Sequence, residues 1–169
     1  MSLEAVTPVA APAVLVIPPN EGRSVDAFGS TAVFKLEGQH TGGALCLAVA
    51  ETPPGAGPPP HVHSRDDEIF FVLEGELSFQ TATGWVPAPQ GSVVYAPRGA
   101  PHTFRNVGTI PSRHLVLALP SGFDEFYRRS GEVFAADGLP DHHKLRSIAK
   151  EFGYAFLPPG SLPPGEASP

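Results

Sequence analysis

Short apolar blocks, separated by glycine and proline, fill most of the chain between residues 13 and 119. Strict alternation of apolar and polar residues is typical of a strand with one buried face, and a continuous apolar run of similar length is typical of a fully buried strand. Ala44-Leu-Cys-Leu-Ala-Val-Ala50 is such a run, and it predicts a strand buried on both faces. The whole pattern predicts strands at 13–17, 31–37, 44–50, 68–73, 77–81, 85–87, 92–96, 102–106 and 113–119.

Many short strands with turns between them predict a β-sandwich or β-barrel. The turns fall at glycines: 38–43, Gly75 and Gly84 are each expected to reverse the chain. The composition agrees, because 21 prolines and 18 glycines disfavour long helices and favour short elements. The fold class is therefore predicted to be all-β.

From Ser121 the periodicity becomes helical. Phe123, Phe126 and Tyr127 form one apolar stripe, and Ser121 with Asp124 three residues later resembles an N-terminal cap. We expect this helix to pack on the barrel; a lid over a cavity is the alternative. A second helix is predicted over 141–152, ended by Gly153.

The 169 residues suggest one domain with three parts. These parts are an N-terminal arm (1–12) and first strand within 1–30, a barrel over 31–120, and C-terminal helices with a disordered tail over 121–169. Net charge is −6 and no basic run exists, which argues against nucleic acid and anionic membrane as partners. The apolar stretch 13–17 is far too short to span a membrane, and a single cysteine, Cys46, fits a reducing, cytoplasmic location.

Histidines gather at two places. In His61-Val-His63, residues two apart on a strand point to the same side. Glu68 is out of phase with them, so a bend is required within Ser64-Arg-Asp-Asp67. In the second segment His102 shares a face with Phe104. Three imidazoles and one carboxylate suit a divalent transition metal.

The predicted metal ligands are His61, His63, Glu68 and His102. Such a set leaves one or two positions open, as a catalytic site requires. Phe70 and Phe104 are expected to be the apolar neighbours in a substrate pocket. Two alternatives stay open, namely Asp67 as the carboxylate ligand and a metal-free barrel used only for binding.

Other polar residues have plainer interpretations. Asp66 and Asp67 are expected to form a solvated turn, and His142-His143 a solvated helix start. His114 is expected to be structural or exposed, with a place facing the cavity beside the metal as the alternative. Cys46 is expected to be a buried, inert thiol.

The two histidine segments resemble the signature motifs of the cupin superfamily. Gly55 to Gly75 matches a glycine, five residues, His-x-His, four residues, glutamate, six residues and glycine. Gly91 to Asn106 matches a glycine, five residues, Pro-x-Gly, two residues, histidine, three residues and asparagine. The resemblance implies a jelly-roll β-barrel whose metal, one of Fe, Mn, Ni, Co, Cu or Zn, is held by the four ligands above. It also implies a homodimer.

A narrower resemblance links the chain with quercetin 2,3-dioxygenase-like cupins. It rests on the Pro-Pro-His-x-His segment, the phenylalanine-rich strand after Glu68, and Phe123-Asp-Glu-Phe-Tyr127. It implies a metal-dependent dioxygenase for an aromatic or apolar small molecule, with Glu68 as ligand and catalytic base. Two alternatives remain, a non-catalytic small-molecule-binding cupin and a sugar isomerase or epimerase. A sugar phosphate would require inward lysine or arginine, and none of the three lysines lies near the motifs.

Overall fold

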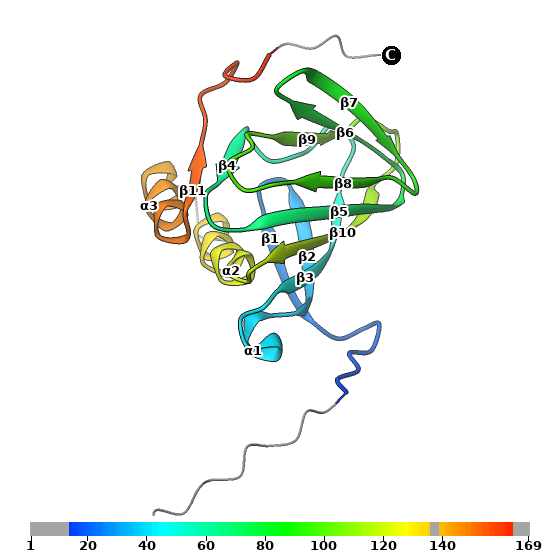
Figure 1. Ribbon diagram of the computed structural model, residues 1–169, viewed down its shortest axis with the longest axis vertical. Coiled ribbons are helices and arrows are strands. Elements are labelled where there is room, and N and C mark those ends of the chain that lie inside the picture. Colours follow the sequence, from blue (N-terminus) through cyan, green and yellow to red (C-terminus); the bar gives the residue numbers. More distant parts are fainter. Residues whose placement is uncertain (1–13, 136–138, 164–169) are drawn as a thin grey trace, which may run out of the picture.

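Antiparallel strands form the body of the protein, and two helices lie against one side of it (Figure 1). The computed structural model describes residues 14–135 and 139–163. The predicted arm, residues 1–12, and the end of the predicted tail, residues 164–169, lie outside this range. The all-β prediction is confirmed, as a jelly-roll barrel with C-terminal helices. No helix within the described residues is long and apolar enough to cross a membrane.

The larger sheet has six strands, all paired antiparallel. In spatial order these are β1 (Arg23–Ala27), β2 (Ser30–Leu36), β3 (Cys46–Thr52), β10 (Ser112–Leu119), β5 (Asp67–Glu74) and β8 (Val93–Ala96). Burial alternates strictly along β10, where His114, Val116 and Ala118 face inward. The even-numbered positions of β3, and Glu68, Phe70 and Val72 of β5, line the same inner face.

Two smaller sheets complete the body. One contains β7 (Gly84–Pro89), β6 (Glu76–Thr81) and β9 (Thr103–Asn106), in that order. The other pairs β4 (His61–His63) with β11 (Tyr154–Phe156), which follows the helices in the chain. Gly75, with a φ of 78°, makes the predicted tight turn between β5 and β6.

The inner faces of the six-stranded and three-stranded sheets pack on one another. Phe70 and Val72 of β5 contact a cluster that includes Leu77, Phe79 and Phe104 of the smaller sheet. Each of these side chains is at most 8% exposed. Burying one such side chain stabilises a fold by about 1.5–3 kcal/mol, so this cluster holds the barrel closed.

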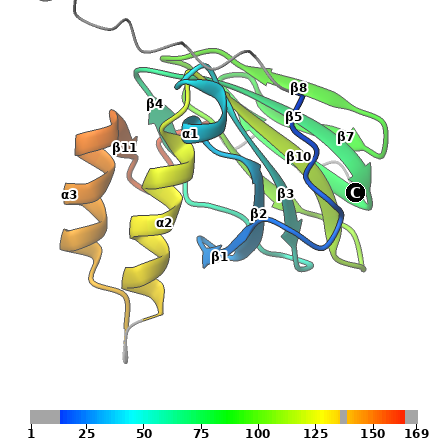
Figure 2. The same cartoon turned by 90° about the horizontal axis from the view of Figure 1, so that it is seen from below.

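A second apolar core lies where α2 (Phe123–Phe134) and α3 (His142–Phe152) cover the β1–β2–β3 end of the larger sheet. Figure 2 shows the two helices lying side by side next to that end. The predicted stripe of Phe126 and Tyr127 packs inward, as do Leu145 and Ile148 of α3. The predicted α3 is confirmed, with Gly153 in the left-handed conformation at its end.

The prediction of a strand at 13–17 is wrong for the described part of that segment. Residues 14–17 form no strand, and Val14 and Val16 are exposed. Pro18 supplies no N–H for a ladder, and no neighbouring strand pairs with the segment. The first strand is instead the polar β1, which only pairs with β2 at the edge of the sheet, so its sequence needs no apolar run.

Three local predictions also need correction. The 44–50 run is not buried on both faces, because Cys46, Ala48 and Ala50 are buried while Leu47 and Val49 are half-buried. The expected turn at 38–43 contains a one-turn helix, α1 (Gly38–Thr41). Helix α2 is capped at Gly122, while the Ser121 hydroxyl donates to the Gly43 carbonyl.

Candidate metal centre

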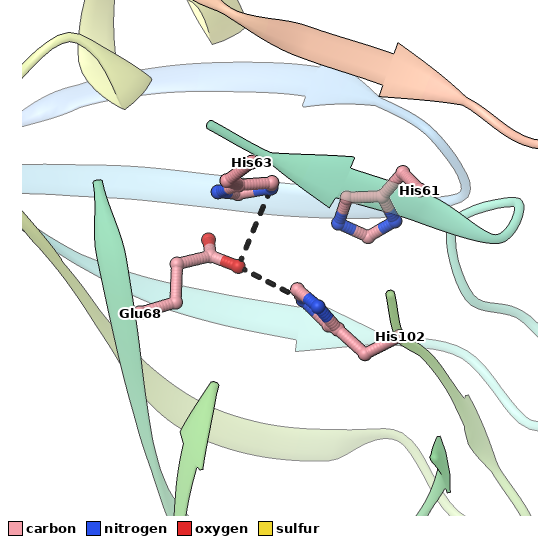
Figure 3. Close-up of side chains that lie close together, drawn as sticks. All are labelled: His61, His63, Glu68 and His102. Carbon is pink, nitrogen blue, oxygen red and sulfur yellow. Dashed lines mark hydrogen bonds and ion pairs between the residues drawn. The ribbon is translucent and has the colours of Figure 1, made fainter. Parts of the chain in front are cut away.

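The four predicted ligands converge at one end of the barrel. His61 and His63 come from β4, Glu68 from β5 and His102 from the residue before β9 (Figure 3). One potential ligand atom from each of the four lies within 4.8 Å of all the others. Segments far apart in the sequence therefore present three imidazoles and a carboxylate to a common point.

Backbone pairing brings His61 and His102 together. Each donates its N–H to the other's carbonyl, at 3.0 and 2.9 Å, in an isolated antiparallel bridge. The predicted break after His63 is also present: β4 ends there, and β5 begins at Asp67 in a different sheet. This change of sheet turns Glu68 onto the face that the two histidines share.

Each of the three imidazoles is held through Nδ1 by an oxygen atom. The pairs are His61 with Pro59 O at 2.9 Å, His63 with Asp66 Oδ2 at 2.9 Å, and His102 with Ala100 O at 3.0 Å. A carbonyl oxygen only accepts hydrogen bonds, so Nδ1 is the donor in His61 and His102. Their Nε2 atoms therefore carry no hydrogen and are available to bind a metal. In metal sites, an oxygen that accepts from the other ring nitrogen commonly fixes a ligand histidine in this way.

Asp66 contradicts the sequence prediction. It was expected in a solvated turn, yet it is 4% exposed and accepts hydrogen bonds from both His63 and the Tyr154 hydroxyl, the latter at 3.1 Å. The Tyr154 ring also lies against the His63 ring, with centroids 4.1 Å apart. Strand β11 covers this part of the chain, which explains why a polar loop residue is buried.

Sequence reasoning missed Asp66 and Tyr154 because their proximity depends on the β4–β11 pairing. The three residues of β11 directly follow a helix and carry only a weak strand pattern. The one available signal was Asp66 itself, three residues after a proposed ligand histidine.

Opposite charges and burial act against each other at Glu68. Burial disfavours its ionised form, but the imidazoles of His63 and His102 outweigh burial and lower the pKa of Glu68 to about 2. Burial also opposes charge on His63, where the carboxylates of Glu68 and Asp66 prevail and raise the pKa. For His61, burial and then its two histidine neighbours lower the pKa to about 3. The site therefore holds an ionised carboxylate beside a neutral imidazole.

These residues fit a divalent transition metal. Glu68 Oε2 lies 3.2 Å from His102 Nε2 and 3.6 Å from His63 Nε2, so the donor atoms face one another at the centre of the cluster. Neutral imidazole nitrogens and a carboxylate oxygen repel one another unless a proton or a cation lies between them. The donor set does not select one metal, because imidazole and carboxylate suit several first-row ions.

A cavity of about 50 Å³ adjoins the cluster. Phe70 and Phe104 both line it, as proposed for a substrate pocket. The remaining wall is mostly apolar and aromatic and includes Phe123, Phe126 and Tyr127 of α2. No lysine or arginine is among its described lining residues.

The other candidate residues lie elsewhere. Asp67 accepts hydrogen bonds from the backbone and guanidinium of Arg98, and it is not part of the four-residue cluster. His142 and His143 are exposed at the start of α3. Cys46 is fully buried, and burial raises the pKa of its thiol to about 12, which makes it unreactive.

Comparison with known proteins agrees with the fold and the motifs. Residues 48–118 match the Cupin_2 family, described as the cupin domain. The chain is 31% identical over 153 residues to Germin-like protein 1-3 of Oryza sativa subsp. japonica, covering 86% of this chain and 68% of that protein. It is 36% identical over 124 residues to Germin-like protein 1-4 of the same plant, covering 67% of this chain and 49% of that one. The chain thus spans about half the length of several curated relatives that it matches.

Among solved structures, KdgF from Halomonas sp. superposes with a TM-score of 0.59 at 19% identity, over 67% of this chain and 99% of KdgF. At that identity the likeness concerns the fold alone. With the two motifs, the convergent cluster and the germin-like relatives, the chain belongs to the cupin superfamily.

Proposed function

We propose that this cupin is a metal-dependent dioxygenase that acts on a small apolar or aromatic molecule. One observation carries the proposal: a cluster of three imidazoles and one carboxylate lies at the end of a cavity that is otherwise mostly apolar. A metal bound there would supply a Lewis acid and, for Fe, Mn, Co, Ni or Cu, a redox centre.

Glu68 is the group best placed to move a proton. It is the one carboxylate among the described residues that line the cavity, and it is fully ionised near neutral pH. No other carboxylate in the described cavity wall could accept the proton of a substrate hydroxyl. Glu68 is therefore proposed both to bind the metal and to accept a proton, as quercetinase-like cupins use their glutamate.

The aromatic walls limit both water and substrate size. Phe70 and Phe104 belong to the barrel core and line the cavity, and Phe123 and Phe126 line it from α2. An apolar cavity of about 150 Å³ is known to admit benzene, three times the volume found here. A flavonol would therefore enter only if the α2 wall moved, and a smaller substrate is favoured.

A non-catalytic binding role is the second candidate, and the small volume of the cavity favours it. A sugar-phosphate isomerase is disfavoured, because the cavity wall offers no cationic side chain for a phosphate among the described residues. Homodimer formation and a cytoplasmic location stay proposals.

The test uses protein purified without a polyhistidine tag, analysed for metal, and loaded in turn with each first-row ion. Oxygen uptake is followed with a flavonol and with smaller enols and catechols. We expect uptake that matches substrate loss in at least one metal form, abolished by Glu68→Gln. Glu74→Gln is the matched control, since Glu74 lies on the same strand and is exposed. Metal-dependent binding without oxygen uptake in any form would favour the binding role instead.

A further inference from the structure

His114 occupies an unusual position in the barrel. It lies near the middle of β10 with no exposed surface, and neither ring nitrogen has a hydrogen-bond partner within the described chain. Its neighbours across the sheet are Ala50 on β3 and Val72 on β5, which offer no polar side chain. The ring nevertheless lines the cavity beside the metal centre.

The other polar side chains of the cavity wall are satisfied. Ser30 bonds Thr52 at 2.7 Å, and the Tyr127 hydroxyl donates to the Ala27 carbonyl at 3.0 Å. Tyr154 donates to Asp66, and the ligand residues bond as described above. Apart from the proposed metal ligands, His114 is the one polar side chain among the described residues of the wall that lacks a hydrogen-bond partner.

Such a group is costly to retain. A buried donor or acceptor with no partner loses its hydration and gains nothing, so an apolar side chain of similar size would be more stable there. Burial lowers the pKa of His114 to about 4, which leaves a neutral ring near pH 7 with one N–H donor and one acceptor nitrogen. A chain that keeps histidine here has a use for those atoms.

The residues around the His114 ring indicate the chemical character of a ligand that would bind there. The His114 ring lies 5.3 Å from Phe104 and 6.3 Å from Phe70, centroid to centroid. Phe70 lies equally close, 6.3 Å, to the His102 ring of the metal cluster. Val116, the next inward residue of β10, adds an apolar surface. The cavity thus combines a metal centre, apolar walls and an imidazole whose two nitrogens are unpaired.

We propose that His114 is a specificity-determining residue that hydrogen-bonds a carbonyl or hydroxyl oxygen of a small, uncharged ligand whose apolar part packs on Phe104 and Val116. The inference rests on the proposed function only in taking this cavity as the substrate site. The volume of about 50 Å³ suits a ligand of few heavy atoms.

The test compares two probes of the same shape, acetone and isobutene. Isobutene carries a CH2 group where acetone carries its oxygen. Binding is measured by NMR on the protein with its native metal content and without oxygen, from the His114 ring nitrogens and the Val116 methyl groups. We expect the ratio of acetone to isobutene affinity to be about 2- to 12-fold higher in the wild type than in His114→Leu, and acetone to shift the His114 ring nitrogen signals.

Three variants distinguish the effect of the hydrogen-bonding group at residue 114 from the effect of cavity volume. His114→Leu should lower the affinity for acetone relative to isobutene and raise Tm by roughly 2–10 °C, since it removes an unpaired buried group. His114→Gln should retain part of the preference. Val116→Ala, the matched control on the same strand and face, should alter the binding of both probes while leaving their ratio unchanged.

The proposal is overturned if the ratio of acetone to isobutene affinity is the same in the wild type and in His114→Leu, or if acetone leaves the His114 signals unmoved. Failure to bind either probe overturns it equally. Because no oxygen is consumed in this experiment, a preserved acetone preference in a protein without dioxygenase activity would reject the proposed function and leave the His114 inference standing.

Discussion

The Asp66 carboxylate and the His63 imidazole are joined by a 2.9 Å hydrogen bond, and the opposite nitrogen of the same ring faces Glu68. Asp66 is fixed in turn by the Tyr154 hydroxyl of β11. The orientation of one proposed ligand therefore depends on a strand that lies more than eighty residues further along the chain.

Replacing Asp66 with asparagine is expected to weaken metal binding by about 10- to 100-fold, because outer-shell carboxylates orient a ligand ring and raise its basicity. Competition against a chelator of known affinity measures the change. Asp67→Asn is the control, since that side chain pairs with Arg98 on the surface. Equal losses in the two variants would mean that Asp66 acts through general charge and not through the His63 ring.

Alanine at His102 should remove most of the metal while leaving the barrel folded. The backbone bridge between residues 61 and 102 uses only main-chain atoms, so it survives the truncation. Elemental analysis of the purified protein, with circular dichroism to monitor the fold, is the measurement. His143→Ala, an exposed histidine outside the cluster, should keep wild-type metal content. A His102→Ala protein that retains its metal would remove this residue from the ligand set.

The sequence was sufficient to predict the barrel and the four convergent side chains, because strand alternation and fixed spacings are local properties. His61 and His63 share a side by strand geometry alone, and the polar stretch after them predicted the bend that redirects Glu68. The motif spacing then brought His102 to the same end of the barrel.

The features that were missed depend on contacts between distant segments. Asp66 has the sequence context of a loop residue and is buried only because β11 covers it. The cavity-facing alternative for His114 is confirmed, but its lack of a hydrogen-bond partner depends on the apolar neighbours across the sheet. Strand β1 has a polar sequence and exists because β2 pairs with it. The pattern of apolar and polar residues within one segment does not indicate which distant segment will pack against it.

The stability of the metal-free protein should depend on pH through His114. Its pKa is about 4 when folded and near 6.5 otherwise, so between these values the unfolded chain binds a proton that the folded chain does not. Acidification then favours unfolding, and the contribution of this residue falls by about 2 kcal/mol between pH 7 and pH 5. Glu68, whose charge acts on His114, stays ionised over this range, since its pKa is about 2.

Denaturant unfolding of the wild type and of His114→Leu at the two pH values tests this expectation. The unfolding free energy of His114→Leu should exceed that of the wild type by more at pH 5 than at pH 7. Proton uptake by His61 on unfolding affects both proteins alike. A gap that stays constant would show that the folded protein protonates His114 near its ordinary pKa.

Gly57 should tolerate substitution less well than Gly55, although only Gly55 belongs to the motif. A Cβ at Gly57 would lie 2.0 Å from the Phe104 carbonyl oxygen, and that oxygen belongs to backbone that cannot turn aside. The loop is fixed there, since Gly55 donates to the Asn106 carbonyl and Asn106 donates to that of Ala56. Gly55 has open space around it and needs only its φ of 76°.

Gly57→Ala is therefore expected to destabilise the fold by about 3 kcal/mol through overpacking, and Gly55→Ala by about 1 kcal/mol through backbone strain. Thermal unfolding measures both. Because the displaced loop lies against β9, directly after His102, Gly57→Ala should also weaken metal binding where Gly55→Ala leaves it nearly unchanged. The reverse order of stability would mean that the loop and β9 can separate without cost, and that the packing of Gly57 on Phe104 does not help to position His102.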